Sequence, residues 1–195
     1  MTQSDAAIST SVNPTRVLFA RIGWMTYYMG PQPGDERPNG GGDHNKKNVG
    51  HELFNFAEFD GRLYGFARAK SGRINLIRID PTAGAAGKLD DVLVIFVARQ
   101  HIIGWYRNAT VYASALPKFS ASVAKEMLRR LKQSGTKGFR LGGYSFEATF
   151  ENVTLLPTYE RTREIPGNVK GGFGQSNIWP AISFEEAARA RTLHG

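Results

Sequence analysis

Residues 91–113 read DVLVIFVARQHIIGWYRNATVYA, and this stretch decides the expected fold. Residues 91–98 form a near-continuous apolar run, which is typical of a strand that is buried on both faces. Residues 102–113 follow closely and are rich in β-branched and aromatic side chains, so we expect them to form the neighbouring strand. Together the two runs predict the centre of a β-sheet.

Further strands are predicted on both sides of this pair. Residues 16–22 (RVLFARI) are mostly apolar and end at a glycine, as a first buried strand would. Asp60 and Gly61 separate two apolar-patterned runs, HELFNFAEF and RLYGFARA, and an Asp-Gly pair in this position is the strongest short hairpin signal in the chain. Residues 73–80 (RINLIRID), together with YSFEATF and VTLLP after residue 143, are predicted to add strands. The sheet should therefore have at least five strands.

Two helices are predicted. One covers residues 120–135 (SASVAKEMLRRLKQSG), where Ser120 or Ser122 can cap the start and Gly135 can end the helix. Its expected apolar face consists of Val123, Met127, Leu128 and Leu131. The other is a short closing helix over residues 183–194 (SFEEAARARTLH). Many short strands and only two helices favour an α+β fold with a curved, mostly antiparallel sheet or a small β-barrel over a doubly wound α/β fold.

Length and composition bound the possible functions. The chain has 195 residues, which fits a disordered arm over residues 1–14 and a single domain over residues 15–195. It contains 25 Lys and Arg against 17 Asp and Glu, and the formal net charge of +8 points to a polyanionic partner, with nucleic acid first. The absence of cysteine excludes a thiolate nucleophile and cysteine-ligated zinc. The sequence contains no long apolar run or signal peptide, so we expect a cytoplasmic protein without membrane contact.

Every tryptophan in the chain lies beside glycine and small polar residues. The three segments are residues 22–28 (IGWMTYY), 104–108 (GWYRN) and 172–179 (GFGQSNIW). An aromatic face next to amide and hydroxyl groups is what a pocket for an unstacked base requires, because rings stack on the base while Asn, Gln and Ser reach its hydrogen-bonding edge. The aromatic residues expected in such a pocket are Trp24, Tyr27, Tyr28, Trp105, Tyr106 and Trp179.

Several motifs occur in an order that resembles a known family. The succession is VLFARIGWMTYYMG, then GGG followed by GHELFNF and YGFA, then VIFVARQHIIGWYRNATVY, LLPTYERTREIP and KGGFGQSNIW. It resembles the N-terminal modules of modification-dependent restriction endonucleases, which are similar to the EVE, YTH and ASCH branches of the PUA superfamily. The resemblance spans residues 16–179. It implies a PUA-like barrel that grips a duplex, rotates one nucleotide out and recognises a modified base in an aromatic cage.

The resemblance also implies roles for individual residues. Trp24, Trp105 or Trp179 would supply the walls of the cage. The side chains that would read the edge of the base are Asn55, Asn108, Ser176 and Asn177. In a full restriction enzyme a nuclease domain accompanies the reader, whereas only a short predicted helix follows residue 179 here. Double-stranded DNA carrying a modified base is therefore the expected ligand, and a nuclease domain or subunit is a second expected partner.

Basic residues are expected to frame the pocket and to contact phosphates without reading the base sequence. They lie in the long glycine- and proline-rich loop over residues 30–50, near the central strands, and after the interior helix. The expected phosphate contacts are Arg37, Lys46, Lys47, Arg99, Arg107, Lys132, Lys137 and Arg140.

No catalytic constellation can be assembled from the sequence. In DHNKKNVGHE, His44 and His51 are seven residues apart, which matches neither the ligand spacing of a zincin nor an HNH nuclease, which needs a third histidine downstream. The sequence has no G-x-S-x-G nucleophile elbow. We therefore expect a binding protein, not an enzyme, that needs no metal or cofactor.

The expected function is that of a specificity module in a modification-dependent restriction or defence system. Two alternatives stay open: an RNA-binding module of similar fold, and a small nucleotide- or nucleoside-processing enzyme that uses residues 44–52. The identity of the modified base also stays open, with cytosine and adenine derivatives such as 5-methylcytosine and N6-methyladenine expected first.

Overall fold

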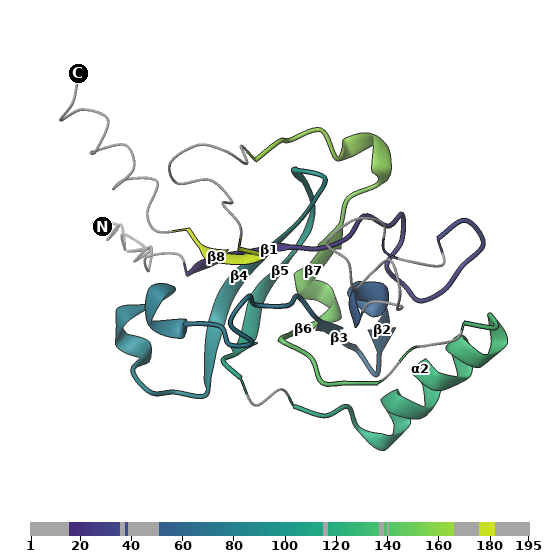
Figure 1. The fold of residues 1–195 in the computed structure, drawn as a ribbon, viewed down its shortest axis with the longest axis horizontal. Helices are drawn as coiled ribbons and strands as arrows, with labels where there is room; N and C mark the ends of the chain where they lie inside the picture. The colour runs from purple at the N-terminus through teal and green to yellow at the C-terminus, as the bar shows by residue number, and fades with distance from the viewer. Residues whose placement is uncertain are drawn as a thin grey trace, which may run out of the picture.

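The central apolar runs form the two longest strands, β4 (Lys88–Ala98) and β5 (His101–Tyr112), which pair antiparallel (Figure 1). The computed structural model describes residues 16–35, 38, 51–114, 117–136, 139, 141–165 and 176–181. Arg99 and Gln100 connect the strands with φ values of 50° and 69°, the left-handed conformation that a tight hairpin requires at both central positions. The predicted pair of neighbouring strands is confirmed.

The strand β4 alternates between buried and half-buried residues over most of its length. Val92, Val94 and Phe96 are fully buried, whereas Leu93 and Ile95 between them are half-buried. Successive strand side chains point to opposite faces, and the main core covers only one of these faces. The expectation that this strand is buried on both faces is therefore wrong up to residue 96.

Six shorter strands extend the sheet to eight strands within the described residues. They are β1 (Val17–Arg21), β2 (Glu58–Phe59), β3 (Arg62–Gly65), β6 (Phe146–Thr149), β7 (Val153–Leu155) and β8 (Ile178–Pro180). The order across the sheet is β2-β3-β6-β5-β4-β1-β8, and β7 also pairs with β5. Among these described strands, β1 and β4 pair parallel and all other pairs are antiparallel. The predicted α+β class with a mostly antiparallel sheet is confirmed.

The sheet bends where β5 meets β6 and β7. β6 pairs with residues 110 and 111 of β5, and β7 pairs with residues 104–106. Between β6 and β7 lies a single 3-10 turn, η4 (Phe150–Asn152), which faces the part of β5 that neither strand pairs. In that part, Asn108 adopts a left-handed φ of 48° and its side chain donates to Asn152 Oδ1 over 3.4 Å. The left-handed residue in β5 thus lies opposite the turn that interrupts β6 and β7. Irregularities that face each other in this way bend a sheet locally.

One α-helix, α2 (Ala121–Gln133), lies in the described part of the chain. Ser120 caps it as predicted, because its hydroxyl accepts a hydrogen bond from the Val123 N–H, and Gly135 follows the end with a φ of 68°. The buried residues of the helix are Val123, Met127 and Leu131. Leu128, expected on the apolar face, is 51 % exposed because it lies one position further round the helix than Met127.

Asp60 and Gly61 form the predicted hairpin turn between β2 and β3, with φ values of 53° and 75°. The segment before it is not the predicted strand. It starts as a 3-10 helix, η1 (His51–Phe54). Leu53 and Phe54 are both buried, and two consecutive side chains of one strand cannot point into the same core.

Residues 73–80 do not form the predicted strand either. They contain a 3-10 turn, η2 (Leu76–Arg78), and a second one, η3 (Pro81–Ala83), follows at once. The apolar alternation changes phase between the buried Leu76 and Ile77, which is 51 % exposed. The Asp80 carboxylate accepts a hydrogen bond from the Thr82 N–H over 2.7 Å, a local bond that competes with strand pairing.

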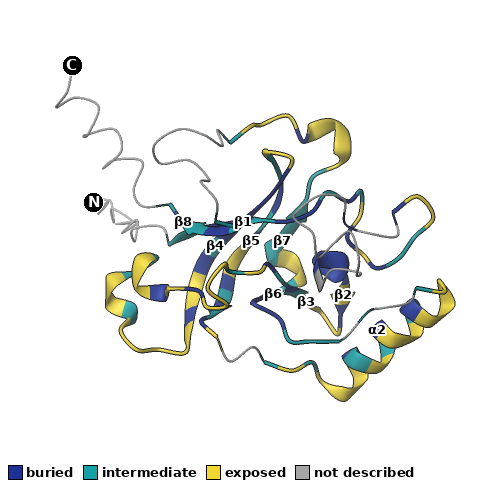
Figure 2. Cartoon of the chain, viewed as in Figure 1, coloured by how far each residue is buried: buried dark blue, intermediate teal, exposed yellow. Residues whose placement is uncertain are grey.

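The main core lies on one face of the sheet. Phe56, Phe96 and Tyr106 pack edge to face at its centre, with ring centroids 4.8 to 5.7 Å apart. Figure 2 shows buried residues along the inner strands and η1, and exposed residues along the outer side of α2. A smaller apolar cluster around Phe19 and Val97 lies on the opposite face of the sheet. The predicted arm over residues 1–14 and the predicted helix over residues 183–194 lie outside the described residues.

Candidate functional site

The loop that follows β1, residues 23–29, contains no helix or strand beyond an isolated β-bridge at Trp24, and side chains hold its backbone in place. We call it the β1 loop. The Gly23 N–H donates to Glu52 Oε2 over 2.7 Å. The Tyr28 hydroxyl donates to the Gly23 carbonyl over 2.6 Å and accepts from the Met25 N–H over 2.9 Å. Burial raises the pKa of Tyr28 above its usual range, so the hydroxyl keeps its proton and can donate.

Two further side chains hold the same loop from other directions. The Asp35 carboxylate accepts from the N–H groups of Thr26 and Tyr27 over 2.6 and 2.7 Å. The buried guanidinium of Arg161 donates to the carbonyls of Met25 and Thr26 over 2.7 and 2.6 Å, and to that of Leu156 over 2.8 Å. Desolvation lowers the pKa of Arg161. These bonds satisfy backbone groups that have no sheet or helix partner, and they order the loop in advance of any ligand.

The β1 loop presents three large side chains. Trp24 is half-buried, and the guanidinium carbons of Arg99 and Arg161 lie 5.1 and 5.0 Å from the centre of its ring, within the range of a cation–π contact. Tyr27 is 48 % exposed and Met29 is 45 % exposed. Because both guanidinium groups lie over the ring, a planar ligand can stack on the indole only if the exposed Arg99 moves off it, and Arg99 can then contact an anion.

The other two tryptophans lie on the opposite face of the sheet from the main core. Trp179 pairs with Phe19, Phe19 with Ile95, and Ile95 with Trp105, so these four residues form one row across β8, β1, β4 and β5. We call it the aromatic row. The rings of Phe19 and Trp179 are stacked, with centroids 4.9 Å apart and planes 12° apart. Trp105 is separated from Trp179 by two strands, which corresponds to roughly 14 Å at normal strand spacing.

The three indoles therefore do not meet around one hollow in the described part of the molecule. Trp24 packs against the main core, and Trp179 belongs to the cluster on the other face of the sheet. The physical reason is the alternation along β1: Leu18 and Ala20 point to the main core while Phe19, the partner of Trp179, points away from it.

Three of the expected pocket residues are fully buried in the core. Tyr28 belongs to this group, and so do Asn55 and Tyr106. The Tyr106 hydroxyl donates to the Asn55 carbonyl. The Asn55 amide accepts from the Phe66 N–H over 2.8 Å and donates to the Phe66 carbonyl over 2.9 Å. Their polar groups are thus used within the fold.

The expected edge readers near the surface occupy separate places. Asn108 lies exposed at the bend of β5. Asn177 Oδ1 accepts from the guanidinium of Arg21 over 2.9 Å, on the same face as the aromatic row. Ser176 lies at a cavity between β1, β8 and residues 69–78. The structure thus brings Asn177 near Trp179 and leaves Asn108 apart from both.

The expected phosphate contacts fall into two groups. Arg99, Arg107 and Lys132 are exposed. The others lie outside the described residues, as do His44 and the side chain of His51: they are Arg37, Lys46, Lys47, Lys137 and Arg140. Glu52 belongs to residues 44–52, the segment proposed for the enzyme alternative. Its carboxylate accepts the hydrogen bond from the Gly23 N–H in the β1 loop. Among the described residues, no three His, Asp or Glu side chains gather as a metal site would require.

Sequence reasoning does not identify the residues that hold the β1 loop. Asp35 sits in a glycine- and proline-rich stretch and Arg161 in a charged one, so neither has a periodic pattern that marks it. The only available signal is a carboxylate placed shortly after an irregular loop, where free backbone N–H groups need an acceptor. Long-range partners such as Arg161 require the tertiary structure.

Comparison of the chain with known family models, with curated proteins and with solved structures finds no match. Within the described ranges, no helix combines the length and apolar character that crossing a membrane requires.

Proposed function

We propose that this domain binds nucleic acid through the β1 loop and reads one unstacked base there, the leading ligand being duplex DNA that carries a modified base. The observation that carries the proposal is the fixation of an irregular loop by Glu52, Asp35 and Arg161 while Tyr27 and Met29 stay accessible. A loop that is ordered before the ligand arrives loses little conformational entropy on binding. The loop can therefore present an indole to a base at low entropic cost.

The surroundings of Trp24 suit a nucleotide. A base stacked on an aromatic ring gains about 1–3 kcal/mol. Arg99 lies over the same ring and is exposed, so a base that displaces it leaves the guanidinium free to contact the neighbouring phosphate. The formal net charge of +8 favours a polyanion over a neutral ligand. A PUA-like barrel, a nuclease partner and a place in a restriction or defence system are finer parts of the same proposal, and the family resemblance supports them.

The aromatic row favours a second candidate, single-stranded RNA. Trp105 and Trp179 lie on one sheet face, and the register places Arg21 on the same face. Sheets that carry aromatic rings and arginines on one face are a common platform for unstacked RNA bases. Loss of binding when each ribose is replaced by deoxyribose would distinguish this candidate from a DNA reader.

A mobility-shift panel tests the proposal. It compares otherwise identical duplexes that are unmodified or carry 5-methylcytosine, 5-hydroxymethylcytosine, N6-methyladenine or phosphorothioate, beside a single-stranded RNA of the same sequence. We expect one modified duplex to bind best and Trp24→Ala to remove that preference by about 1–3 kcal/mol, because the stacking surface is lost. Binding of the unmodified duplex should change little, since phosphate contacts remain.

Two variants serve as controls. Trp24→Phe keeps an aromatic face and should retain most of the preference. Trp105→Ala, on the opposite face of the sheet, should leave duplex binding unchanged and weaken RNA binding only if the RNA candidate holds. The proposal fails if Trp24→Ala weakens every duplex equally, or if no modified duplex is preferred, while circular dichroism shows that the variants are folded.

A further inference from the structure

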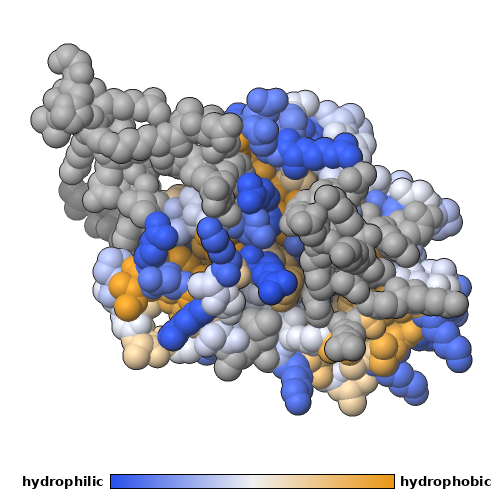
Figure 3. All heavy atoms as spheres, viewed as in Figure 1, coloured by the Kyte–Doolittle hydropathy of each residue, from blue (hydrophilic) through white to orange (hydrophobic). Residues whose placement is uncertain are grey.

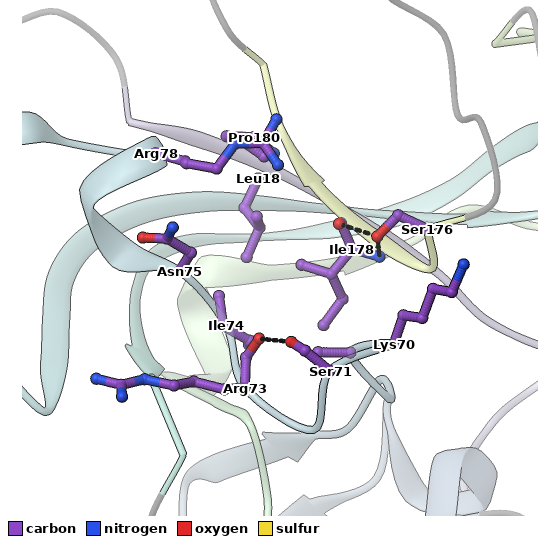
Figure 4. Close-up of a pocket in the computed structure, with 11 residues that line it drawn as sticks. Leu18, Lys70, Ser71, Arg73, Ile74, Asn75, Arg78, Ser176, Ile178 and Pro180 are labelled. Atoms are coloured by element: carbon purple, nitrogen blue, oxygen red, sulfur yellow. Dashed lines mark hydrogen bonds between the residues drawn. The ribbon is translucent and has the colours of Figure 1, made fainter.

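A cavity of about 490 Å³ lies between residues 69–78 on one side and β1 and β8 on the other (Figure 4). Its volume falls within the range of roughly 300–1,000 Å³ that small-molecule sites occupy. The floor is apolar: Figure 4 shows the side chains of Leu18, Ile74 and Ile178 turned toward its middle, and all three are buried. No residue of the β1 loop and no indole is among the described residues that line it.

The rim of the cavity is positively charged. Lys70, Arg73 and Arg78 line it, and no described carboxylate does. Within the described residues, the guanidinium groups of Arg73 and Arg78 take part in no hydrogen bond or ion pair. The nearest carboxylate in sequence, Asp80, is engaged with Arg16 over 2.6 Å. The charges of Arg73 and Arg78 are therefore not neutralised by a described residue.

The walls of the cavity are anchored. Gly72 turns the chain with a φ of 73°, its N–H donates to the Ala69 carbonyl over 2.9 Å, and the Ile74 N–H donates to the Ala113 carbonyl at the end of β5 over 2.7 Å. On the other side the Ser176 hydroxyl donates to the Ile178 carbonyl over 2.6 Å. These bonds hold both walls without a ligand, so the cavity is preformed.

We infer that this cavity is a second binding site, separate from the β1 loop, and that it takes a planar heterocycle carrying a phosphate, as in a nucleoside monophosphate. Ile74 and Ile178 keep a small exposed apolar edge that the ring can contact, and the fully buried Leu18 supports them from beneath. Asn75, which also lines the cavity, supplies an amide for its edge, and Ser71, whose hydroxyl donates to the Arg73 carbonyl over 2.9 Å, keeps its oxygen as an acceptor. Arg78, beside Pro180 at one end of the rim, and Arg73, whose side chain turns outward at the other end, each have the fork of donors that matches a phosphate, so either can take the phosphate of the ligand.

Isothermal titration of the full chain with nucleoside 5′-monophosphates of the four common bases tests this site. Adenosine, guanosine, cytidine and uridine, and inorganic phosphate alone, are the comparison ligands. We expect at least one monophosphate to bind at least tenfold more tightly than its nucleoside and than inorganic phosphate, because only the monophosphate engages both floor and rim. Equal binding of phosphate and monophosphate, or no binding of any monophosphate, would overturn the inference.

A charge-matched pair of variants locates the site. Arg73→Ala with Arg78→Ala should weaken monophosphate binding at least tenfold, and both residues are exposed, so folding should be unaffected. Lys118→Ala with Lys125→Ala removes the same charge from exposed positions outside the cavity and should leave the affinity unchanged. An equal loss in both double variants would mean that only the net charge matters, and would refute a built site.

The source of the nucleotide and the independence of the two sites can be read from the same variants. The competitors are a short oligonucleotide with a 5′-phosphate and the same oligonucleotide with a 5′-hydroxyl. If only the 5′-phosphate form competes as well as the free monophosphate, the natural ligand is a strand end. If neither form competes, the natural ligand is the free mononucleotide. Trp24→Ala should keep monophosphate binding, and the Arg73 and Arg78 variant should keep discrimination between duplexes. Failure of one site is thus distinguishable from failure of the other.

Discussion

At the scale of single residues, Arg161 is the most constrained side chain of the candidate site. It is 5 % exposed, and its guanidinium donates to three backbone carbonyls in two segments. Desolvation of a buried charge is costly, and charge-assisted hydrogen bonds of this kind offset the cost. Arg161 therefore connects the β1 loop to the segment after β7.

Replacing Arg161 by methionine should destabilise the protein by about 3 kcal/mol. The change keeps an apolar stem and leaves the carbonyls of Met25, Thr26 and Leu156 without their donor, and each unsatisfied buried group costs about 1–3 kcal/mol. Urea unfolding followed by circular dichroism measures the loss. Arg163→Met, at an exposed position, should change stability by less than about 0.5 kcal/mol. Equal small effects would show that Arg161 does not hold the loop.

At the scale of elements, β7 approaches β5 very closely at Gly104. A Cβ atom at this position would lie 2.3 Å from the Thr154 carbonyl oxygen and 3.0 Å from the Phe56 ring. Real Cβ atoms do not come this close to a backbone oxygen, so any other residue would force the two strands apart. The pairing of β7 with β5 thus depends on this one glycine.

Gly104→Ala should accordingly cost about 1–3 kcal/mol, the usual penalty for overpacking a core. Gly87→Ala is the matched control, because a Cβ there meets nothing within 4 Å. This control should be neutral or slightly stabilising, since alanine restricts the unfolded chain. Thermal unfolding of both variants provides the measurement, and a Gly104 variant as stable as the Gly87 variant would contradict the contact.

The elements that the sequence predicts well are those with local signals. The Asp60-Gly61 turn and the Ser120 cap depend on residues a few positions apart, and both are confirmed. β8 lies inside a stretch rich in turn residues and forms only because it pairs with β1, a partner far away in the sequence. The parallel pairing of β1 with β4 is equally non-local. Local patterns cannot encode such partners.

In the candidate site, too, the features with local signals can be predicted from the sequence and those that depend on distant partners cannot. Composition and motifs single out Trp24 as a candidate ligand contact, and the structure shows it half-buried beside Arg99. The same reasoning expects Trp105 and Trp179 beside it, whereas the alternation along β1 directs Trp179 to the opposite face. The cavity with Arg73 and Arg78 lies in residues 69–78, for which the sequence pattern predicts mainly a strand. Its shape arises from the turns that replace that strand.

At the scale of the whole molecule, exposed basic side chains lie on separate elements, with Arg99 and Arg107 on the β4–β5 hairpin and Lys125 and Lys132 on α2. On the face shown in Figure 3, hydrophilic side chains lie over the centre of the molecule and along the outer side of α2, and apolar surface shows between them. Arg99 is exposed in the turn between β4 and β5, and Arg107 is exposed in the middle of β5. A long polyanion can contact such separated cations at once, whereas a small anion cannot.

Binding of an unmodified duplex should therefore weaken steeply with salt. Each phosphate contact contributes a slope of about −0.9 in a plot of log affinity against log salt concentration, so Arg99→Gln and Arg107→Gln should each flatten the slope by about 0.9. Filter binding or fluorescence anisotropy over a salt series measures it. Lys125→Gln, on the exposed side of α2, is the control, and an equal flattening in this control would contradict specific contacts at Arg99 and Arg107.

The pairing of β1 with β8 has a consequence for how the domain can be connected to other proteins. The Ala181 N–H donates to the Val17 carbonyl over 3.0 Å, so the start of the first described strand and the end of the last one are immediate neighbours. A unit with adjacent entry and exit points can be spliced into a surface turn of a host without separating the two halves of that turn.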